Sequence, residues 1–582
     1  MPKKLNSSQS FLQGALILML GTLIVKVVSL LFKIPITNML SEAAMSYFEN
    51  AYTFFTLFST LATAGFPVAI SKIVAEYTAK GRFKDNRKLL SRCLILFLFT
   101  GLFFSFCMFL GADLFAALIN NPGAELSIRV LSPAVFCLCL MSAFRGYYQG
   151  LQNMIPTAVS QIIESVVKMI CGVAFTYLAV NYCKNEFDLY GTVLGKFYAS
   201  QAAADVVIYQ VGSAGALFGV VISTAAGCIF LFLRHKLVGD GFSREMLALS
   251  PQPIPTKPMI SSVLSLSIPI CLGSLVLNLS SMVDMVTVLG RLNHIMEVSP
   301  DSVRAMYGNA IPSAMYNSLV PAHLYGAYTS IAVTISNIVP SATTGFGISA
   351  LPVVSAAWAK RSRREVGRSI NSVLRITALF AVPAGVGIMM MAAPICRLFF
   401  FNKPMGVAIA VPILQVLGLA SIFISLTTTL NSLLQAVGRV SVPVRLVVIG
   451  AVVKFALNFI LVGIPSINLK AVGYATLICY FIMTCLAVYV LSEVTHIKLS
   501  LFHLLFKPFI AALLCGFTAA LSFDFISSKW ESSLAVIPAI ALGACVYFVA
   551  VIFLGAVRKD DILMLPKGEK IAKILEKWSL IS

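Results

Sequence analysis

Apolar runs of about 20 residues or more recur along nearly the whole chain, separated by short polar segments. A run of this length crosses a bilayer as an α-helix, whereas a membrane β-barrel would show short alternating segments. The pattern predicts an all-α integral membrane protein with about fourteen spans. They lie near residues 11–34, 47–74, 92–118, 126–150, 156–181, 212–234, 260–290, 322–356, 368–393, 406–437, 442–463, 469–492, 502–522 and 534–556.

The composition agrees with this class. Of the 582 residues, 59% are hydrophobic and only 11% are charged, with a mean hydropathy of +0.91, whereas a soluble domain has about 25% charged residues. The 13 cysteines lie mostly inside apolar runs, and the five histidines are scattered. Neither set has the spacing of a disulfide framework or a zinc site, so we expect no metal and no cofactor.

The net charge of +20 could suggest a nucleic-acid partner. In a membrane protein, however, basic residues gather in cytoplasmic loops, so we expect no nucleic acid. Basic segments follow spans 2, 6, 8 and 14, and the intervening loops are neutral or mixed, with a weak exception at 394–405. The bias predicts cytoplasmic termini, a retained first span without a cleavage site, and a basic amphipathic tail at 557–582 on anionic lipids.

The chain also repeats itself. "MLGTLIVKVVSLL" (19–31) corresponds to "CLGSLVLNLSSMV" (271–283), and "YYQGLQNMIP" with "ESVVKM" corresponds to "LLQAVGRVSVP" with "AVVKF". Three pairs of polar residues align: Lys26 with Asn278, Gln149 with Gln435, and Lys168 with Lys454. Since both halves start on the same side of the membrane, the repeat is parallel.

The duplication predicts two pseudo-symmetric lobes of six helices followed by two C-terminal helices. The segments are an N-terminal lobe at 1–236, a cytoplasmic linker at 237–259, a C-terminal lobe at 260–493, two further spans at 494–556, and the tail at 557–582. Two-lobed membrane proteins of this kind usually bind substrate between the lobes and expose it to either side in turn.

Ionisable side chains inside the membrane are costly, so they normally face a cavity or a partner. The candidates for substrate contact are Lys26, Lys33, Arg145, Lys168, Lys454 and Asn278, and those for charge partners are Glu49, Glu164, Asp284 and Asn458. Lys26 and Lys33 are seven residues apart and share a helix face. Because bases outnumber acids, a water-filled cavity lined by them attracts an anion such as a diphosphate head group. A transporter of cationic drugs would need the opposite sign.

Simpler interpretations stay open for three sites. Glu164 and Lys168 are four residues apart, can pair directly, and could form only a structural ion pair. Lys33 could extend to the membrane interface. Arg145 could anchor the cytoplasmic end of its helix, although arginine is also the usual bidentate ligand of phosphate. For Lys26 we favour a cavity, because its own span has no acid one turn away.

Signatures of membrane-bound or soluble enzymes do not appear. "GTVLGKF" (191–197) has too few residues between its glycines for a nucleotide-binding loop, and no serine-hydrolase elbow or zinc-protease motif is present. We therefore expect a secondary transporter and not an enzyme, driven by an ion gradient, the membrane potential or the substrate gradient.

Several segments resemble one known family. "GFPVAISKIVAEY" (65–77), "FRGYYQGLQNMIPTAVSQIIE" (144–164) and "ISALPVVSAAWAKR" (348–361) are similar to the polysaccharide-transporter and stage V sporulation protein B group, itself similar to the lipid II flippase MurJ. The resemblance covers essentially the whole chain. It implies a bacterial cytoplasmic-membrane flippase for an undecaprenyl-diphosphate-linked glycan or peptidoglycan precursor, working by alternating access, in cell-wall synthesis or sporulation.

The sequence departs from the MurJ pattern at several sites. An Arg-Asp pair of MurJ reads Phe32-Lys33 here, and an Asp-Arg pair reads Tyr328-Thr329. Some MurJ proteins hold sodium with acids and amides in spans 7 and 11, where this chain offers Asp284 with Lys454 and Asn458. We hypothesise that the lysine ammonium takes the place of sodium. Sodium-dependent transport lost on Asp284→Asn would contradict this.

Two other functions stay open. One is a multidrug exporter of the same superfamily, the multidrug/oligosaccharidyl-lipid/polysaccharide exporters, which would need an acidic cavity. The other is a non-transporting scaffold that recruits cell-wall or sporulation enzymes. Truncating residues 559–582 while transport stays intact would separate the scaffold from the flippase. We expect a monomer.

Overall fold

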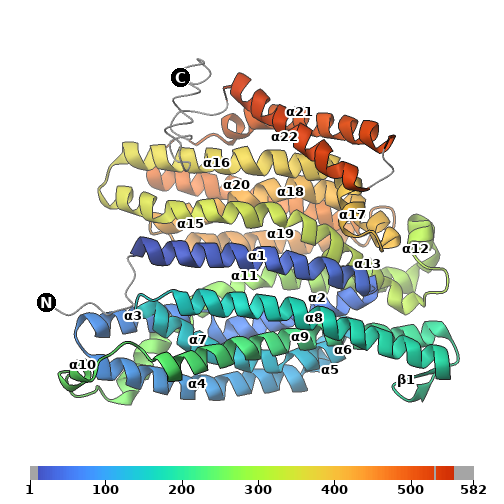
Figure 1. The fold of residues 1–582 in the computed structure, drawn as a ribbon. Helices are drawn as coiled ribbons and strands as arrows, with labels where there is room; N and C mark the ends of the chain where they lie inside the picture. Colours follow the sequence, from blue (N-terminus) through green and yellow to red (C-terminus); the bar gives the residue numbers. More distant parts are fainter. Residues whose placement is uncertain (1–10, 498, 530–532, 556–582) are drawn as a thin grey trace. The chain divides into compact units, whose positions relative to one another are not determined.

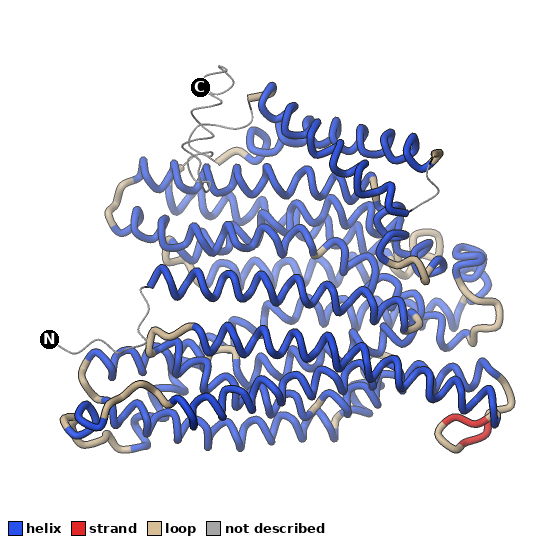
Figure 2. Tube along the Cα trace, viewed as in Figure 1, coloured by secondary structure: helices blue, strands red, loops and turns tan. Residues whose placement is uncertain are grey.

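The computed structural model describes residues 11–497, 499–529 and 533–555. These residues form long helices and one short two-stranded hairpin (Figures 1 and 2). They divide into two compact units, Met1–Val286 and Thr287–Ser582, with the division inside helix α11 (Thr256–Val298). The predicted all-α membrane architecture is confirmed. The predicted amphipathic tail at 557–582 lies outside the described residues.

The first unit holds the elements that precede the division in α11. In chain order they are α1 (Phe11–Met39), α2 (Glu42–Thr63), α3 (Phe66–Ala79), α4 (Phe83–Leu110), α5 (Ala112–Leu118), η1 (Pro122–Ala124), α6 (Glu125–Leu131), α7 (Pro133–Gly150), α8 (Ile155–Tyr190), β1 (Thr192–Val193), β2 (Lys196–Phe197), α9 (Gln201–Val238) and α10 (Arg244–Ala248). Helix α8 packs along both α1 and α9, and α7 packs along α3 and α4.

The second unit holds the remaining helices. They are α12 (Pro300–Tyr307), η2 (Gly308–Ala310), η3 (Asn317–Leu319), α13 (Val320–Ala327), η4 (Tyr328–Val333), α14 (Thr334–Ser336), α15 (Ile338–Ala359), α16 (Arg363–Met390), α17 (Ala392–Phe399), α18 (Pro404–Ala436), α19 (Ser441–Leu461), α20 (Lys470–Thr495), α21 (Leu501–Ser527), η5 (Ser533–Ala535) and α22 (Val536–Phe553). Helix α18 packs against α15, α16 and α20, and the α21–α22 pair packs on α16.

Thirteen helical segments of the described residues are long and apolar enough to cross a membrane. Each overlaps one of the predicted spans. The remaining prediction, 260–290, lies within α11, which is 43 residues long.

The predicted span at 322–356 is not one continuous α-helix. The chain runs through α13, a π-helical turn at Tyr328–Val333 and the short α14 before α15 begins at Ile338. The Thr334 hydroxyl donates to the Thr329 carbonyl, five residues earlier, at 3.4 Å. Hydropathy averaged over a span does not detect this break, because the span as a whole is apolar.

The turns that follow α7 and α18 have the same hydrogen bond. After α7, the backbone N–H of Gln152 donates to the Gln149 carbonyl. After α18, the N–H of Gly438 donates to the Gln435 carbonyl in the same way. In each turn the residue that donates this hydrogen bond has a positive φ, 57° at Gln152 and 83° at Gly438. The two aligned glutamines therefore accept the same turn hydrogen bond, as Thr78 does after α3.

Helices α8 and α9 form a pair that is longer than a membrane is thick. They contain 36 and 38 residues, or about 54 and 57 Å at 1.5 Å per residue, against a hydrocarbon core of about 30 Å. The pair extends past the neighbouring helices of its unit and ends in the β1–β2 hairpin (Figure 1). Glu186 accepts hydrogen bonds from the backbone of Leu194 and Gly195 there, at 3.0 and 2.7 Å.

A close approach joins α8 to α9 in the middle of the pair. A Cβ atom on Gly219 would lie only 2.3 Å from the Gly172 Cα atom. Two glycines are required here because neither backbone can move away without separating the helices.

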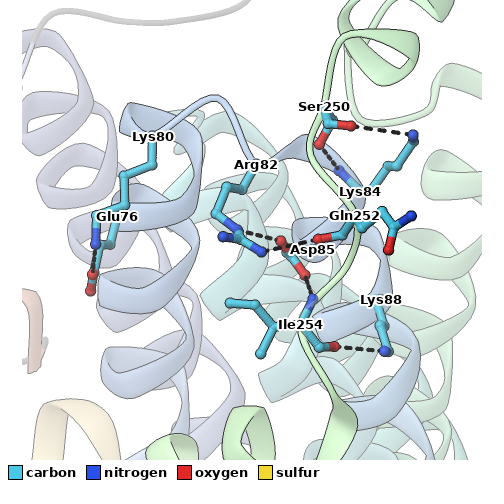
Figure 3. Close-up of polar contacts among 9 residues, drawn as sticks. All are labelled: Glu76, Lys80, Arg82, Lys84, Asp85, Lys88, Ser250, Gln252 and Ile254. Atoms are coloured by element: carbon cyan, nitrogen blue, oxygen red, sulfur yellow. Dashed lines mark hydrogen bonds and ion pairs between the residues drawn. The ribbon is translucent and has the colours of Figure 1, made fainter.

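The segment between α9 and α11 is bound to the start of α4 (Figure 3). The Asp85 carboxylate accepts a hydrogen bond of 2.7 Å from the Ile254 backbone N–H and pairs with Arg82 at 2.6 Å. The Lys88 ammonium donates to the Ile254 carbonyl at 2.7 Å. The basic segment that follows α3 therefore holds the linker in addition to providing the charge bias.

A second polar cluster joins α4, α7 and the end of α9. The Arg87 guanidinium donates to both carboxylate oxygens of Asp240, at 2.7 and 2.9 Å, and the Tyr147 hydroxyl donates to Asp240 at 3.2 Å. Burial alone would raise the pKa of Asp240, but its hydrogen bonds with Arg87 hold that pKa below the usual value. Next to Tyr147, the Tyr148 hydroxyl lies 3.0 Å from Nδ1 of His235. The tyrosines of "RGYYQG" thus connect three helices.

Candidate substrate-binding site

Lys33 lies near the end of α1 and faces α2. Its ammonium forms an ion pair with Glu49 and lies 5.3 Å from the centroid of the Phe48 ring. Both charged side chains are largely buried, with 16% and 21% of their surface exposed. Lys33 is thus held by an acid and an aromatic ring inside the unit.

Lys168 lies on α8 and contacts a second aromatic ring, that of Phe32 on α1. Its ammonium is 5.4 Å from the centroid of the Phe32 ring, and Phe32 in turn packs against Phe48 at 6.3 Å between centroids. Within the described residues Lys168 has no ion pair. A cation over an aromatic face gains about 0.5–2 kcal/mol without losing its charge. Lys168 therefore contacts an aromatic ring, and that ring packs against the ring beside the Lys33–Glu49 pair.

Glu164 pairs with Arg145 and not with Lys168, so the expected pairing four residues apart is wrong. The Arg145 Nη2 atom lies 2.9 Å from Oε2 of Glu164, and Nε donates to the Ser160 hydroxyl at 3.1 Å. Side chains four apart on a helix can meet, but Arg145 reaches Glu164 from the neighbouring α7. The Nε and Nη2 donors of Arg145 are thus directed to α8.

The other candidates of the first unit lie further along α1 and α11. Lys26 is exposed on α1, and Asn278 and Asp284 are half-buried on α11. The Asn278 amide donates to the Thr60 hydroxyl at 2.8 Å, which ties α11 to α2. The structure therefore brings together Lys33, Glu49 and Lys168, and separately Arg145 with Glu164.

In the second unit, Lys454 and Asn458 lie one turn apart on α19. Lys454 is buried, and Asn458 is fully buried and donates from its amide to the Thr287 hydroxyl at 3.3 Å. Asp284, predicted to lie near them, belongs to the part of α11 in the other unit.

Sequence reasoning missed the aromatic pair Phe32–Phe48 and one basic residue, Arg291. The aromatic residues gave no signal among the many phenylalanines of the apolar runs. Arg291 lies one residue beyond the predicted end of its span, whereas α11 continues to Val298. A search for charged residues just outside the predicted spans would have found Arg291.

An apolar groove of about 670 Å³ lies in the second unit. Helices α15, α16, α17, α21 and α22 form its walls, with side chains such as Phe380, Pro383, Ile540 and Phe548. The α21 and α22 helices lie outside the duplicated parts of the chain. Such a groove can take a hydrocarbon chain but offers almost no polar group to a head group.

The helices form a polytopic all-α membrane fold that known transporters share. It matches the inward closed structure of the lipid II flippase MurJ with a TM-score of 0.58 and 15% identity, over 93% of this chain and 98% of that one. It also matches an inward-facing multidrug resistance MATE family transporter of the MOP superfamily, with a TM-score of 0.57 and 16% identity, over 83% of this chain and 100% of that one. At these identities the likeness establishes the fold.

Within this class the chain belongs to the family described as polysaccharide biosynthesis protein, whose profile matches residues 11–358. The profile of the lipid II flippase MurJ matches residues 340–541. Lipid II flippase MurJ of Bacillus subtilis (strain 168) is 26% identical, over 82% of each chain. Stage V sporulation protein B of the same organism is 23% identical, over 96% of this chain and 98% of its own. The family resemblance inferred from the sequence is confirmed.

Proposed function

We propose that this protein is a flippase that moves an undecaprenyl-diphosphate-linked glycan or peptidoglycan precursor across the bacterial cytoplasmic membrane by alternating access. Both termini would lie in the cytoplasm. The observation that carries the proposal is Lys168, a cation inside a membrane helix with no ion pair among the described residues, next to the Lys33–Glu49 pair. Charge of this kind inside a membrane is retained where it has a ligand.

The chemistry of the first unit suits a diphosphate. The membrane helices carry Lys26, Lys33, Arg145 and Lys168 against Glu49, Glu164 and Asp284. Two of these acids are bound to Lys33 and Arg145, which leaves the net charge positive. An anionic substrate could compete with Glu49 for Lys33 while Lys168 binds the same head group.

The apolar groove of the second unit suits the other end of such a molecule. Its carbon-lined walls would hold part of a polyprenyl chain. The MurJ relative and the MurJ structure, whose names state lipid II transport, support this substrate class.

A second candidate is a multidrug exporter, favoured by the fold match to the MATE transporter. A cationic drug would meet the positive charge of Lys168, which makes this the weaker proposal.

The test is translocation of a labelled undecaprenyl-diphosphate glycolipid in proteoliposomes. Wild type should translocate it, and Lys168→Ala and Lys26→Ala should each lower the rate by about tenfold, as expected for one lost charge-assisted contact. Lys184→Ala is the matched control, because Lys184 is exposed on the same helix beyond the predicted span. No transport by well-folded wild type would contradict the proposal, and drug efflux would favour the exporter. Transport that survives Lys168→Ala would remove the lysine from the site.

A further inference from the structure

Arg291 is a basic residue on a membrane helix and is not one of the predicted site residues. It lies on α11, seven residues before the end of that helix. Its Nε atom is buried and has no hydrogen-bond partner within the described residues. The residue as a whole is half-buried. Leaving a buried charged donor without an acceptor is costly.

The position of the guanidinium is fixed from two sides by α19 and the turn that follows it. The Arg291 Cζ atom lies 4.7 Å from the centroid of the Phe459 ring. A Cβ atom on Gly463 would be 2.2 Å from the Arg291 Nη2 atom. The ring supports one face of the fork, and the absence of a side chain at residue 463 leaves room for it. Both contacts orient the donors without using any of them.

Neither ordinary explanation of such an arginine fits this geometry. The helix dipole favours a cation only within the last turn, and Arg291 lies further from the end of α11 than that. A snorkelling arginine extends its head group into water, whereas the Nε atom here is buried.

Polar side chains on α11 and α19 lead towards Arg291. Thr287 lies one turn before it on the same face of α11 and bonds to Asn458 of α19. Lys454 is buried one turn before Asn458 on α19. Basic and polar groups therefore continue along this helix pair from the buried Lys454 to Arg291.

We propose that Arg291 is an anion-binding residue that takes a phosphate group of a polyprenyl diphosphate. The inference rests on the proposed function and adds to it a second phosphate contact, at the end of α11 that the predicted topology puts on the non-cytoplasmic side. A guanidinium binds two phosphate oxygens through parallel N–H donors, which a lysine ammonium cannot reproduce. Phe459 and Gly463 are positioning residues, since they set the direction of the fork.

The experiment measures binding of undecaprenyl diphosphate to the purified full-length protein in detergent. The variants are Arg291→Lys, which keeps the charge, and Gly463→Ala, which keeps the arginine but displaces its fork. Both should weaken binding about tenfold, equivalent to about 1.4 kcal/mol. Lys470→Ala should stay within about twofold, because Lys470 is an exposed cation at the start of α20 that follows the same turn. The displaced atom is the end of a flexible side chain, so Gly463→Ala should fold and melt like wild type.

Two further ligands identify the source of the phosphate. Undecaprenol, which has no phosphate, should bind equally well to wild type and to Arg291→Lys. Inorganic diphosphate should bind much more weakly than undecaprenyl diphosphate; equal affinity would assign the site to free phosphate and overturn the lipid assignment. Wild-type affinity of both Arg291→Lys and Gly463→Ala for undecaprenyl diphosphate would overturn the role of Arg291. In that case wild-type translocation would still stand, so failure of this inference differs from failure of the proposed function.

Discussion

The Arg145–Glu164 pair allows a quantitative test of how the first unit holds its charges. The two groups are 2.9 Å apart, with 14% and 25% of their side chains exposed. At an effective dielectric constant of about 20, their attraction is about 6 kcal/mol. Desolvation offsets most of this, so the coupling between them should be about 1.5 kcal/mol. Replacing one partner alone leaves the other charge buried, and each single substitution should cost about 2–3 kcal/mol.

The assay is a double-mutant cycle of Arg145→Gln and Glu164→Gln, with the free energy of unfolding measured by SDS titration of the protein in micelles. The matched control is the cycle of Glu164→Gln with Lys168→Gln. Lys168 has no ion pair with Glu164, so that coupling should stay below about 0.5 kcal/mol. A larger coupling for Lys168 than for Arg145 would show that the pairing derived from the structure is wrong. So would a coupling near zero in the Arg145 cycle.

Three further predictions concern packing, pH and backbone strain. Gly219→Ala should lower the free energy of unfolding by about 2–3 kcal/mol, since its Cβ would lie 2.3 Å from the Gly172 Cα atom; thermal unfolding would measure the loss, and an unchanged midpoint would contradict it. Asp240→Asn should destabilise the protein at neutral pH, because Arg87 holds the pKa of Asp240 low in the folded state. This contribution to stability is present above the ordinary pKa of 3.8 and fades as the pH falls below it. The melting curves of wild type and variant should therefore converge only below that pH. Gly438→Ala should cost about 1 kcal/mol because φ is 83°, and a gain in stability would argue against the turn.

The sequence predicted the architecture well because hydropathy and duplication both depend on residue order alone. The apolar runs placed the spans, and the alignment of Gln149 with Gln435 identified two turns with the same hydrogen bonds. Neither signal depends on which side chains meet across the fold. The π-helical turn at Tyr328–Val333 was missed for the same reason, since it lies inside one predicted apolar span, 322–356.

The site was predicted less completely, because residue spacing gives neighbours only along one helix. Glu164 and Lys168 satisfy the spacing of a helical ion pair, yet Arg145 from α7 takes the carboxylate. The Lys168 ammonium lies over the Phe32 ring of α1 instead, and no local sequence pattern connects these two residues. Arg291 was missed because the predicted span ends at residue 290, one residue before it. A charged residue is the usual signal that a span has ended, so the prediction stopped there.

The length of the α8–α9 pair has a mechanical consequence. The backbones of Gly172 and Gly219 approach each other closely, so we expect the two helices to tilt together as one lever. About 24 Å of that lever lies beyond a hydrocarbon core of about 30 Å. A small tilt at the level of the lysines therefore becomes a larger displacement at the β1–β2 tip. A spectroscopic label on exposed Lys196 would report that angle from the aqueous phase while the transport path stays unmodified.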